Sequence, residues 1–300
     1  MKRASLLGAL LLLLTAGLTG DLALGQSLMT QVHSERSLYR EVLVYEQDGL
    51  RCMCFTRQCR IGRQSCIELR NPQRFALNYT RMMLAGTLFT QDDPRRILII
   101  GLGGGSIPTA LRTLLPKAQV EVVEIDPAVT KVAKRFFSFN DDAPTHVTEV
   151  DGRVFVKRAA REGRQYDVIL LDAFDHEYIP EHLLTQEFLQ EVKSLLAPRG
   201  VIVANTFSSS KLYDHESTTY ASVFGTFYNL KRENRVIVAR LGGLPPYAEI
   251  AQRAAQFETA LKPFGADVPS MLKMFATEVD WDTKARVLTD QYSPANLLNH

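Results

Sequence analysis

The chain has 300 residues, of which 46% are hydrophobic and 23% charged, a composition typical of a globular protein with one large domain and a small accessory one. A formal net charge of +2 gives no strongly basic surface, so we do not expect nucleic acid as a partner. The sequence has no internal repeat and no long run of like charges, which excludes a repeat array and a charged tail.

The N-terminus has the pattern of an export signal. Lys2 and Arg3 precede an apolar run with leucine at every position from 10 to 14, and Ala23 and Gly25 then offer small residues for a signal peptidase. We therefore predict that residues 1–25 are a signal peptide and that the protein is exported, for example to the periplasm. An uncleaved membrane anchor is one alternative, although the run is short for a membrane span. A misassigned start codon, which would leave the protein cytoplasmic, is the other.

Residues 27–70 are predicted to form a small antiparallel β domain. Runs rich in strand-forming residues at 41–46 and 50–56 flank a turn, and a third strand is expected at 65–69. All four cysteines lie here, namely Cys52, Cys54, Cys59 and Cys66. Export would favour two disulfides, in any of three pairings. Reduced thiols and a metal site are the alternatives, and the spacing lacks the paired C-x2-C units of a zinc ribbon.

Residues 71–300 are predicted to form the large domain, which opens with a helix at 71–90. Short apolar strands then alternate with helices, and such alternation indicates a parallel sheet that helices cover on both faces. The strands are expected at 97–100, 120–125, 146–150, 166–171 and 200–205, and the helices at 106–115, 127–137, 152–161 and 184–196.

The end of this domain predicts its fold class. Strands at 225–232 and 235–241 are too close for a crossover helix, so they should form an antiparallel pair at the sheet edge. Two helices are expected after them, at 247–263 and 268–276. We therefore predict an α/β fold of the class I methyltransferase type: a seven-stranded, mostly parallel sheet with helices on both faces, plus the small N-terminal antiparallel β unit.

A glycine-rich loop follows the first strand of the predicted parallel sheet, in the order Gly101-Leu102-Gly103-Gly104-Gly105-Ser106. Ligands of such sheets bind beyond the carboxyl ends of the strands. Glycine lets the backbone approach a ligand closely, and the following helix offers free N–H groups at its N-terminus. We predict that Gly101, Gly103 and Gly105 contact a cofactor. Taken alone, the loop is equally explained as a tight turn.

Acidic residues follow the next three strands. Glu124 and Asp126 are placed to accept the hydroxyls of a ribose, and Asp151-Gly152 to accept the amino group of an adenine. Asp172 follows the fourth strand. Each acid alone is as well explained as a helix cap. Because the glycine-rich loop and these acids all follow the carboxyl ends of parallel strands, they should share one edge of the sheet. We therefore predict an adenosine-containing cofactor. An NAD site would need glycine where this chain has Ser106.

At these positions the sequence resembles the spermidine synthase family, the polyamine aminopropyltransferases. The likeness covers roughly residues 38–240 and is carried by the segments 97–106, 124–126, 151–152 and 166–172. Gln64 and Tyr79 are similar to a glutamine and a tyrosine that line the active site of the family. The segment 179–183 and Thr289-Asp290 are closer to a divergent branch, described as spermidine synthase-like or methyltransferase-like.

The resemblance implies a transferase that moves an aminopropyl group from decarboxylated S-adenosylmethionine to an amine such as putrescine, without a metal. Asp172 is expected to take the proton of the attacking amine, and Asp175 and Tyr79 to orient that amine. Gln64 is expected among the residues that bind the donor. The resemblance also implies a homodimer as a partner.

Two departures from the family pattern keep other functions open. Gly104 stands where the family loop usually carries an acid that pairs with the terminal ammonium of the donor. Arg81 and Ala85 stand where the family usually has a glutamate and a histidine, and the positive charge of Arg81 opposes a cationic substrate. An S-adenosylmethionine-dependent methyltransferase and a non-catalytic binding protein that retains the fold are therefore the alternatives.

Overall fold

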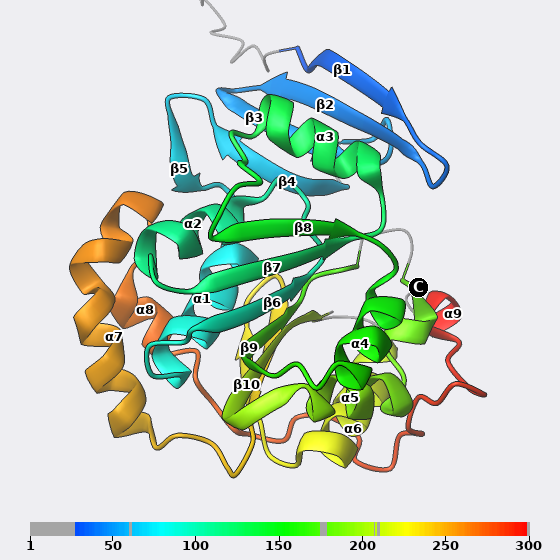
Figure 1. The fold of residues 1–300 in the computed structure, drawn as a ribbon, viewed down its shortest axis with the longest axis vertical. Helices are drawn as coiled ribbons and strands as arrows, with labels where there is room; N and C mark the ends of the chain where they lie inside the picture. Colours follow the sequence, from blue (N-terminus) through cyan, green and yellow to red (C-terminus); the bar gives the residue numbers. More distant parts are fainter. Residues whose placement is uncertain (1–27, 60–61, 175–178, 207, 209–210, 299–300) are drawn as a thin grey trace, which may run out of the picture.

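The structure is a computed structural model, and it describes residues 28–59, 62–174, 179–206, 208 and 211–298. The predicted signal at 1–25 and the predicted role of Asp175 lie outside these residues. Two sheets with flanking helices make up the fold (Figure 1). Across the described ranges, no helix is both long and apolar enough to cross a membrane.

The N-terminal sheet is an antiparallel meander with the strand order β1-β2-β3-β4-β5. Its strands are β1 (Thr30–Arg36), β2 (Glu41–Gln47), β3 (Leu50–Cys54), β4 (Arg63–Glu68) and β5 (Asn71–Phe75). Disulfides join Cys52 to Cys66 and Cys54 to Cys59, which is one of the three pairings that the sequence allows. Cys52 and Cys66 are direct partners in the β3–β4 register, so this bridge ties the two strands together.

The second sheet confirms the predicted fold class. Its strand order is β11-β12-β10-β9-β6-β7-β8, with parallel pairing from β8 to β10 and antiparallel pairing of β12 with β10 and β11. The strands are β6 (Arg96–Ile100), β7 (Gln119–Glu124), β8 (Thr145–Glu149), β9 (Tyr166–Leu171), β10 (Leu196–Thr206), β11 (Tyr228–Lys231) and β12 (Arg235–Arg240). The central strands β6 and β9 consist mainly of buried apolar residues, as expected for strands that helices cover on both faces.

Helices cover the two faces of the large sheet as separate layers (Figure 1). One layer packs in the larger apolar core and consists of α1 (Asn78–Thr90), α2 (Ser106–Leu114), α7 (Tyr247–Leu261) and α8 (Val268–Leu272). The other layer consists of α4 (Gly152–Arg161), α5 (Gln186–Ser194) and α6 (Leu212–Phe224). The short helices are η1 (Glu181–Leu183), η2 (Lys262–Phe264) and α9 (Ala295–Leu298).

Helix α3 (Pro127–Phe136) joins the two sheets. Val129 and Val132 of α3 pack against Val42 and Val44 of β2 in one buried cluster. Figure 1 shows α3 between the N-terminal sheet and the edge of the large sheet at β8. The N-terminal sheet is thus held over the carboxyl ends of the parallel strands.

Three elements differ from the sequence prediction. The helix predicted over 71–90 begins only at Asn78, because 71–75 form β5, and the N-terminal sheet therefore runs past the predicted boundary at residue 70. Strand β1 and helix α6 were not predicted. β1 and β5 are mostly exposed and carry no apolar alternation, so the sequence gives no strand signal there.

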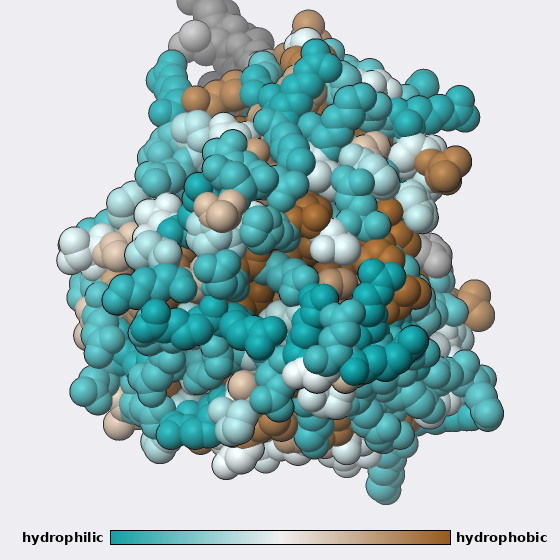
Figure 2. Space-filling model, viewed as in Figure 1, coloured by the Kyte–Doolittle hydropathy of each residue, from teal (hydrophilic) through white to brown (hydrophobic). Residues whose placement is uncertain are grey.

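The molecular surface agrees with this division into core and solvent-facing residues. In the view of Figure 2 most of the surface is hydrophilic, and hydrophobic residues are visible only in limited patches. Few large apolar side chains are strongly exposed among the described residues, Leu28 and Leu38 being the most exposed at 90% and 99%. The apolar residues of the sequence are therefore used mainly to build the core.

Candidate active site

A cavity of about 790 Å³ lies at the carboxyl ends of the parallel strands, between the two sheets. The sequence analysis expected Glu124, Asp151 and Asp172 to share one edge of the sheet, and all three line this cavity. The other predicted site residues that line it are Gln64, Tyr79, Gly101, Gly103, Asp126 and Gly152. Gly105 does not line it, and Asp175 lies outside the described residues.

Asp172 directly follows β9 and is the most chemically distinctive residue of the cavity. Its carboxylate is partly accessible from the cavity but is crowded by protein, and this burial raises the pKa of Asp172 to about 7. Hydrogen bonds from Asn205 and Tyr79 oppose the rise, whereas the negative charge of Glu124 adds to it. Asn205 Nδ2 donates to Asp172 Oδ1 at 3.0 Å. Such a carboxyl exchanges protons near neutral pH, as a general base must.

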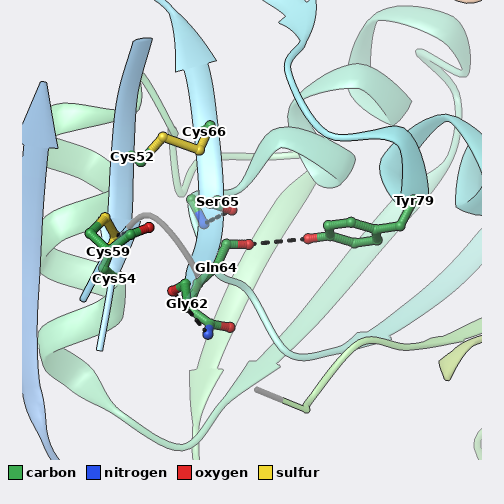
Figure 3. The surroundings of a disulfide bond; sticks show 9 residues. Cys52, Cys54, Cys59, Gly62, Gln64, Ser65, Cys66 and Tyr79 are labelled. Atoms are coloured by element: carbon green, nitrogen blue, oxygen red, sulfur yellow. Dashed lines mark hydrogen bonds between the residues drawn. A yellow bond between two sulfur atoms is a disulfide. The ribbon is translucent and has the colours of Figure 1, made fainter. Parts of the chain in front are cut away.

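Tyr79 stands at the start of α1 and faces Asp172 across the cavity. Its hydroxyl donates to the backbone oxygen of Gln64 at 3.3 Å (Figure 3). Burial and the negative charge of Asp172 raise the pKa of Tyr79 well above its usual value, so the phenol stays protonated and remains a hydrogen-bond donor. The amide of Gln64 itself turns to the backbone oxygen of Gly62 at 3.4 Å.

The glycine loop is shaped by close packing as well as by access to the cavity. Gly101 has φ +102°, and a Cβ at this position would lie 2.2 Å from the backbone oxygen of Asp172. Gly105 has φ +75°, and its Cβ would lie 2.5 Å from the ring of Phe139. Gly101 is therefore required to let the ends of β6 and β9 meet, and Gly105 to pack the start of α2.

Gly104 occupies a position where a side chain does not fit the present packing. Its N–H donates to Ser65 Oγ at 2.8 Å, and a Cβ would lie 2.9 Å from Ser65 Cβ and 3.0 Å from the ring of Phe137. Ser65 comes from β4, next to Gln64 and one residue before Cys66 (Figure 3). The N-terminal sheet thus fills the space that the acid of the family pattern would need.

Glu124 and Asp126 are both hydrogen-bonded within the protein, but they differ in how deeply they are buried. Glu124 accepts one bond from the backbone N–H of Leu102 and one from that of Asp126, both at 3.0 Å, and burial raises its pKa. Asp126 caps α3 through the N–H of Ala128 at 2.9 Å and accepts the hydroxyl of Ser37 at 2.7 Å. Each oxygen of both carboxylates thus has one structural partner. Glu124 is 8% exposed and Asp126 only 1%, so Glu124 is the better placed of the two to accept ribose hydroxyls.

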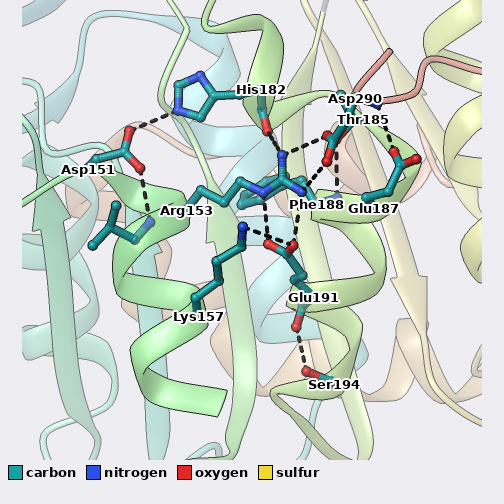
Figure 4. Close-up of polar contacts among 11 residues, drawn as sticks. Asp151, Arg153, Lys157, His182, Thr185, Glu187, Phe188, Glu191, Ser194 and Asp290 are labelled. Carbon is teal, nitrogen blue, oxygen red and sulfur yellow. Dashed lines mark hydrogen bonds and ion pairs between the residues drawn. The ribbon is translucent and has the colours of Figure 1, made fainter. Parts of the chain in front are cut away.

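Asp151 caps α4 and also contacts a histidine. Its Oδ1 accepts the N–H of Val154 at 3.0 Å, and its Oδ2 lies 2.8 Å from His182 Nε2 (Figure 4). His182 belongs to η1 and lines the same cavity. The cavity wall beside the predicted adenine subsite is thus formed by η1 together with Asp151.

Residues 76–236 match the family model for the spermine/spermidine synthase domain. The chain belongs to this family. A polyamine aminopropyltransferase of Vibrio vulnificus is 50% identical over 295 residues, which are 96% of this chain and 97% of that protein. The fold is also that of a probable spermidine synthase from Corynebacterium glutamicum, with a TM-score of 0.65 and 19% identity over 88% of this chain and 97% of that chain.

A methyltransferase is also similar to this member of the spermine/spermidine synthase family. The crystal structure of human methyltransferase-like protein 13 in complex with SAH has a TM-score of 0.54 and 25% identity, over 74% of this chain and all of that chain. The two reaction types that the sequence left open thus share one architecture, so the choice between them depends on the side chains of the cavity.

In this family member, the C-terminal segment buttresses the cavity wall at η1. Arg153 of α4 pairs with both oxygens of Glu191 at 2.9 Å and donates to both oxygens of Asp290 at 2.7 and 2.8 Å (Figure 4). Asn296 bonds the backbone N–H and oxygen of Ile179 at 2.9 and 3.1 Å and the Glu181 carboxylate at 3.1 Å. These contacts hold η1 against the sheet.

Many residues of the cavity region were not predicted as site residues from the sequence, among them Ser65, His182, Asn205 and Glu233. Asn205 had a usable signal, because it ends the fifth predicted strand and so obeys the rule that selected the acids. Ser65, His182 and Glu233 had none, since their places depend on how separate elements pack. Within the described ranges, no group of three or more His, Cys, Asp or Glu side chains is arranged to hold a metal ion.

Proposed function

We propose that this chain transfers the aminopropyl group of decarboxylated S-adenosylmethionine to a diamine such as putrescine, as a step of polyamine biosynthesis. The observation that carries the proposal is the Asp172 carboxyl, whose pKa is raised to about 7 and which faces a cavity large enough for both substrates. Family membership supplies the reaction type.

The chemistry requires one proton transfer and one displacement. The attacking amine is an ammonium ion at neutral pH, so it must first lose a proton, which Asp172 accepts. The free nitrogen lone pair then forms a bond to the propyl carbon beside the sulfonium as the carbon–sulfur bond breaks. Sulfur keeps that electron pair, and the products are the aminopropylated amine and methylthioadenosine. Asn205 holds the Asp172 carboxylate in place during these steps through its hydrogen bond, and the Tyr79 hydroxyl lies close to that carboxylate.

The donor would lie along the β6–β8 side of the cavity. Glu124 is placed to accept the ribose hydroxyls, because it is less buried than Asp126 and each of its oxygens keeps a second lone pair beside its one backbone partner. Asp151 and Gly152 would face the adenine, and the loop from Gly101 to Gly103 would approach the sulfonium end.

Mass analysis of the product tests this function directly. Purified protein is incubated with putrescine and either decarboxylated S-adenosylmethionine or S-adenosylmethionine, and the amine products are identified by mass. We expect an aminopropylated diamine with the first donor only. Asp172→Asn should bind methylthioadenosine as the native protein does while forming almost no product. Methylated putrescine, or no product with either donor, would refute the proposal.

Methyl transfer from S-adenosylmethionine is the second function that an observation favours. Gly104 leaves the loop without an acid to attract an ammonium or to repel a carboxylate at the end of the donor, and Ser65 and Phe137 close the space around it. A protein that selects its donor by other contacts would give aminopropylated product in the same experiment, whereas a methyltransferase would not.

We also propose that the protein is exported, and the two disulfides support this because they persist in oxidising compartments. Cell fractionation followed by thiol labelling tests it. We expect to find the protein in an extracytoplasmic fraction, with none of its four cysteines labelled by the thiol reagent. A protein found in the cytoplasm with four labelled thiols would contradict the proposal.

A further inference from the structure

A further carboxylate of the cavity, Glu233, comes from the β10–β12 side of the sheet, away from Glu124 and Asp151 on the β7–β8 side. Glu233 lies in the hairpin between β11 and β12, and it lines the cavity together with Asp172. The antiparallel register pairs Thr206 of β10 with Arg235 of β12. The start of β12 therefore lies beside the carboxyl end of β10, which brings this hairpin to the edge where Asp172 is found.

Residues of the same two elements contact both Asp172 and Glu233. Asn205 near the end of β10 donates to Asp172, and Ser208 just after β10 donates to the backbone oxygen of Glu233 at 2.6 Å. Tyr79 in the first turn of α1 faces Asp172, and the preceding residue, Asn78, contacts Glu233. Glu124 and Asp151, in contrast, lie at the ends of β7 and β8. Asp172 and Glu233 therefore bound the half of the cavity away from the predicted adenosine subsite.

Asn78 holds the side chain of Glu233 in a defined orientation. Asn78 Nδ2 donates to Glu233 Oε2 at 2.6 Å, and Asn78 Oδ1 accepts from Arg81 Nη1 at 2.8 Å. A guanidinium can only donate, so the amide oxygen must face Arg81 and the amide NH2 must face Glu233. Arg81, which stands where the family usually has a glutamate, thus turns Asn78 toward a carboxylate from another element.

The negative charge of Glu233 is not neutralised within the described part of the chain. Its side chain is exposed, and its carboxylate has no ion pair with any described Lys, Arg or His. Arg235, two residues further on, turns inward to Asn229 and Ser217. A carboxylate that a neutral amide orients toward a cavity, without a cation of its own, is suited to a cationic group of a ligand.

We propose that Glu233 binds the distal ammonium of the diamine acceptor and thereby selects dicationic over monocationic amines. This assignment rests on the proposed aminopropyl transfer. At neutral pH both nitrogens of a diamine are protonated, and only the reacting one gives up its proton to Asp172. The second nitrogen keeps its positive charge throughout the reaction. It therefore needs an anion in the half of the cavity bounded by Asp172 and Glu233, at the end away from Asp172. Glu233 supplies this charge, which position 81 no longer provides.

The test compares two acceptors in two variants. Initial rates are measured with putrescine and with n-butylamine, which has the same carbon chain but only one amine. We expect Glu233→Gln to raise the KM for putrescine by about 10- to 100-fold, because a charge-assisted hydrogen bond is lost. The kcat, the KM for the donor and the kinetics with n-butylamine should stay close to those of the native protein.

Glu258→Gln on the exposed side of α7 is the matched control, since it removes the same charge away from the cavity and should change none of these constants. Glu233→Asp, which keeps the charge, should recover part of the affinity. Equal losses with putrescine and n-butylamine, or no change with either, would overturn the role of Glu233 while leaving aminopropyl transfer intact. Absence of any aminopropylated product from the native protein would overturn both.

Discussion

Replacement of Asn205 by alanine is expected to shift the pH dependence of turnover toward higher pH. Asn205 Nδ2 donates to Asp172 Oδ1 at 3.0 Å, and this bond lowers the pKa of Asp172 by stabilising its ionised form. Without the bond the carboxyl holds its proton more tightly, so a higher pH is needed to generate the base. Catalysis requires the ionised carboxylate, and activity is therefore lost as the pH falls through the pKa of Asp172.

The size of the shift follows from the strength of such a bond. A hydrogen bond to a charged group contributes about 1.5 kcal/mol or more, which corresponds to about one pKa unit. The pKa of Asp172 is about 7 in the native protein. In Asn205→Ala it should thus be about 8, so the ionised fraction at neutral pH falls from roughly one half to roughly one tenth. Turnover should be about fivefold lower there and close to native at about two pH units higher.

The assay is kcat/KM for the acceptor across this pH range in both proteins. The acceptor's own ionisation affects both proteins equally, so the ratio of the two kcat/KM values isolates Asp172. Asn234→Ala, which changes another cavity asparagine without a contact to Asp172, should leave the midpoint unchanged. If kcat/KM of Asn205→Ala is lower than that of the native protein by the same factor at every pH, Asn205 does not change the pKa of Asp172, and the argument is refuted.

Three further substitutions test other features. Asp172→Asn should raise the melting temperature by about 2 °C at pH above 7, where the raised pKa of Asp172 makes its ionised form destabilise the folded state. At pH below 4 the carboxyl is protonated in both the folded and the unfolded protein, so no rise is expected. Equal rises in melting temperature at the two pH values would contradict the raised pKa. Gly101→Ala should destabilise the fold by about 2–4 kcal/mol in chemical denaturation, because its Cβ would meet the Asp172 backbone. Gly243→Ala is its control, with a matching φ of +103° and no atom within 4 Å of the added Cβ, and an equal loss there would assign the effect to backbone strain alone. Asn296→Ala should raise the donor KM several-fold in initial-rate measurements with little change in kcat, since η1 loses its anchor; an unchanged donor KM would contradict that role.

The strands of the large sheet and the antiparallel pair at its edge could be predicted because their signals are local. Ile97 to Ile100 and Val168 to Leu171 are unbroken apolar runs, which only a strand buried on both faces explains. The elements that were missed lack such a signal. β5 has Pro72 and a single buried residue, and α6 carries Thr218 and Thr219 in its middle, where β-branched residues lower helix propensity.

The residues of the candidate site that follow parallel strands were predicted from the sequence. Those whose position depends on how separate elements pack together were missed. Residues at the carboxyl ends of parallel strands must share an edge, so Glu124, Asp151 and Asp172 could be grouped from the sequence. The partner of Asp151 could not, because His182 is 31 residues away and reaches it only through η1. Glu233 likewise depends on the β10–β12 register, which no local pattern reveals.

The contacts of the C-terminal residues Asp290 and Asn296 have a practical consequence for work with this protein. Asp290 and Asn296 are bonded to Arg153 and Ile179 in the wall beside the proposed adenine subsite. Ala295 and Leu298 of α9, at the red end of the chain in Figure 1, pack with Ile179 and Leu184. A fusion partner or affinity tag appended after residue 300 is expected to disturb these contacts. The tagged protein should then bind nucleosides more weakly than the untagged protein does. Purification tags are therefore better placed away from this C-terminal segment.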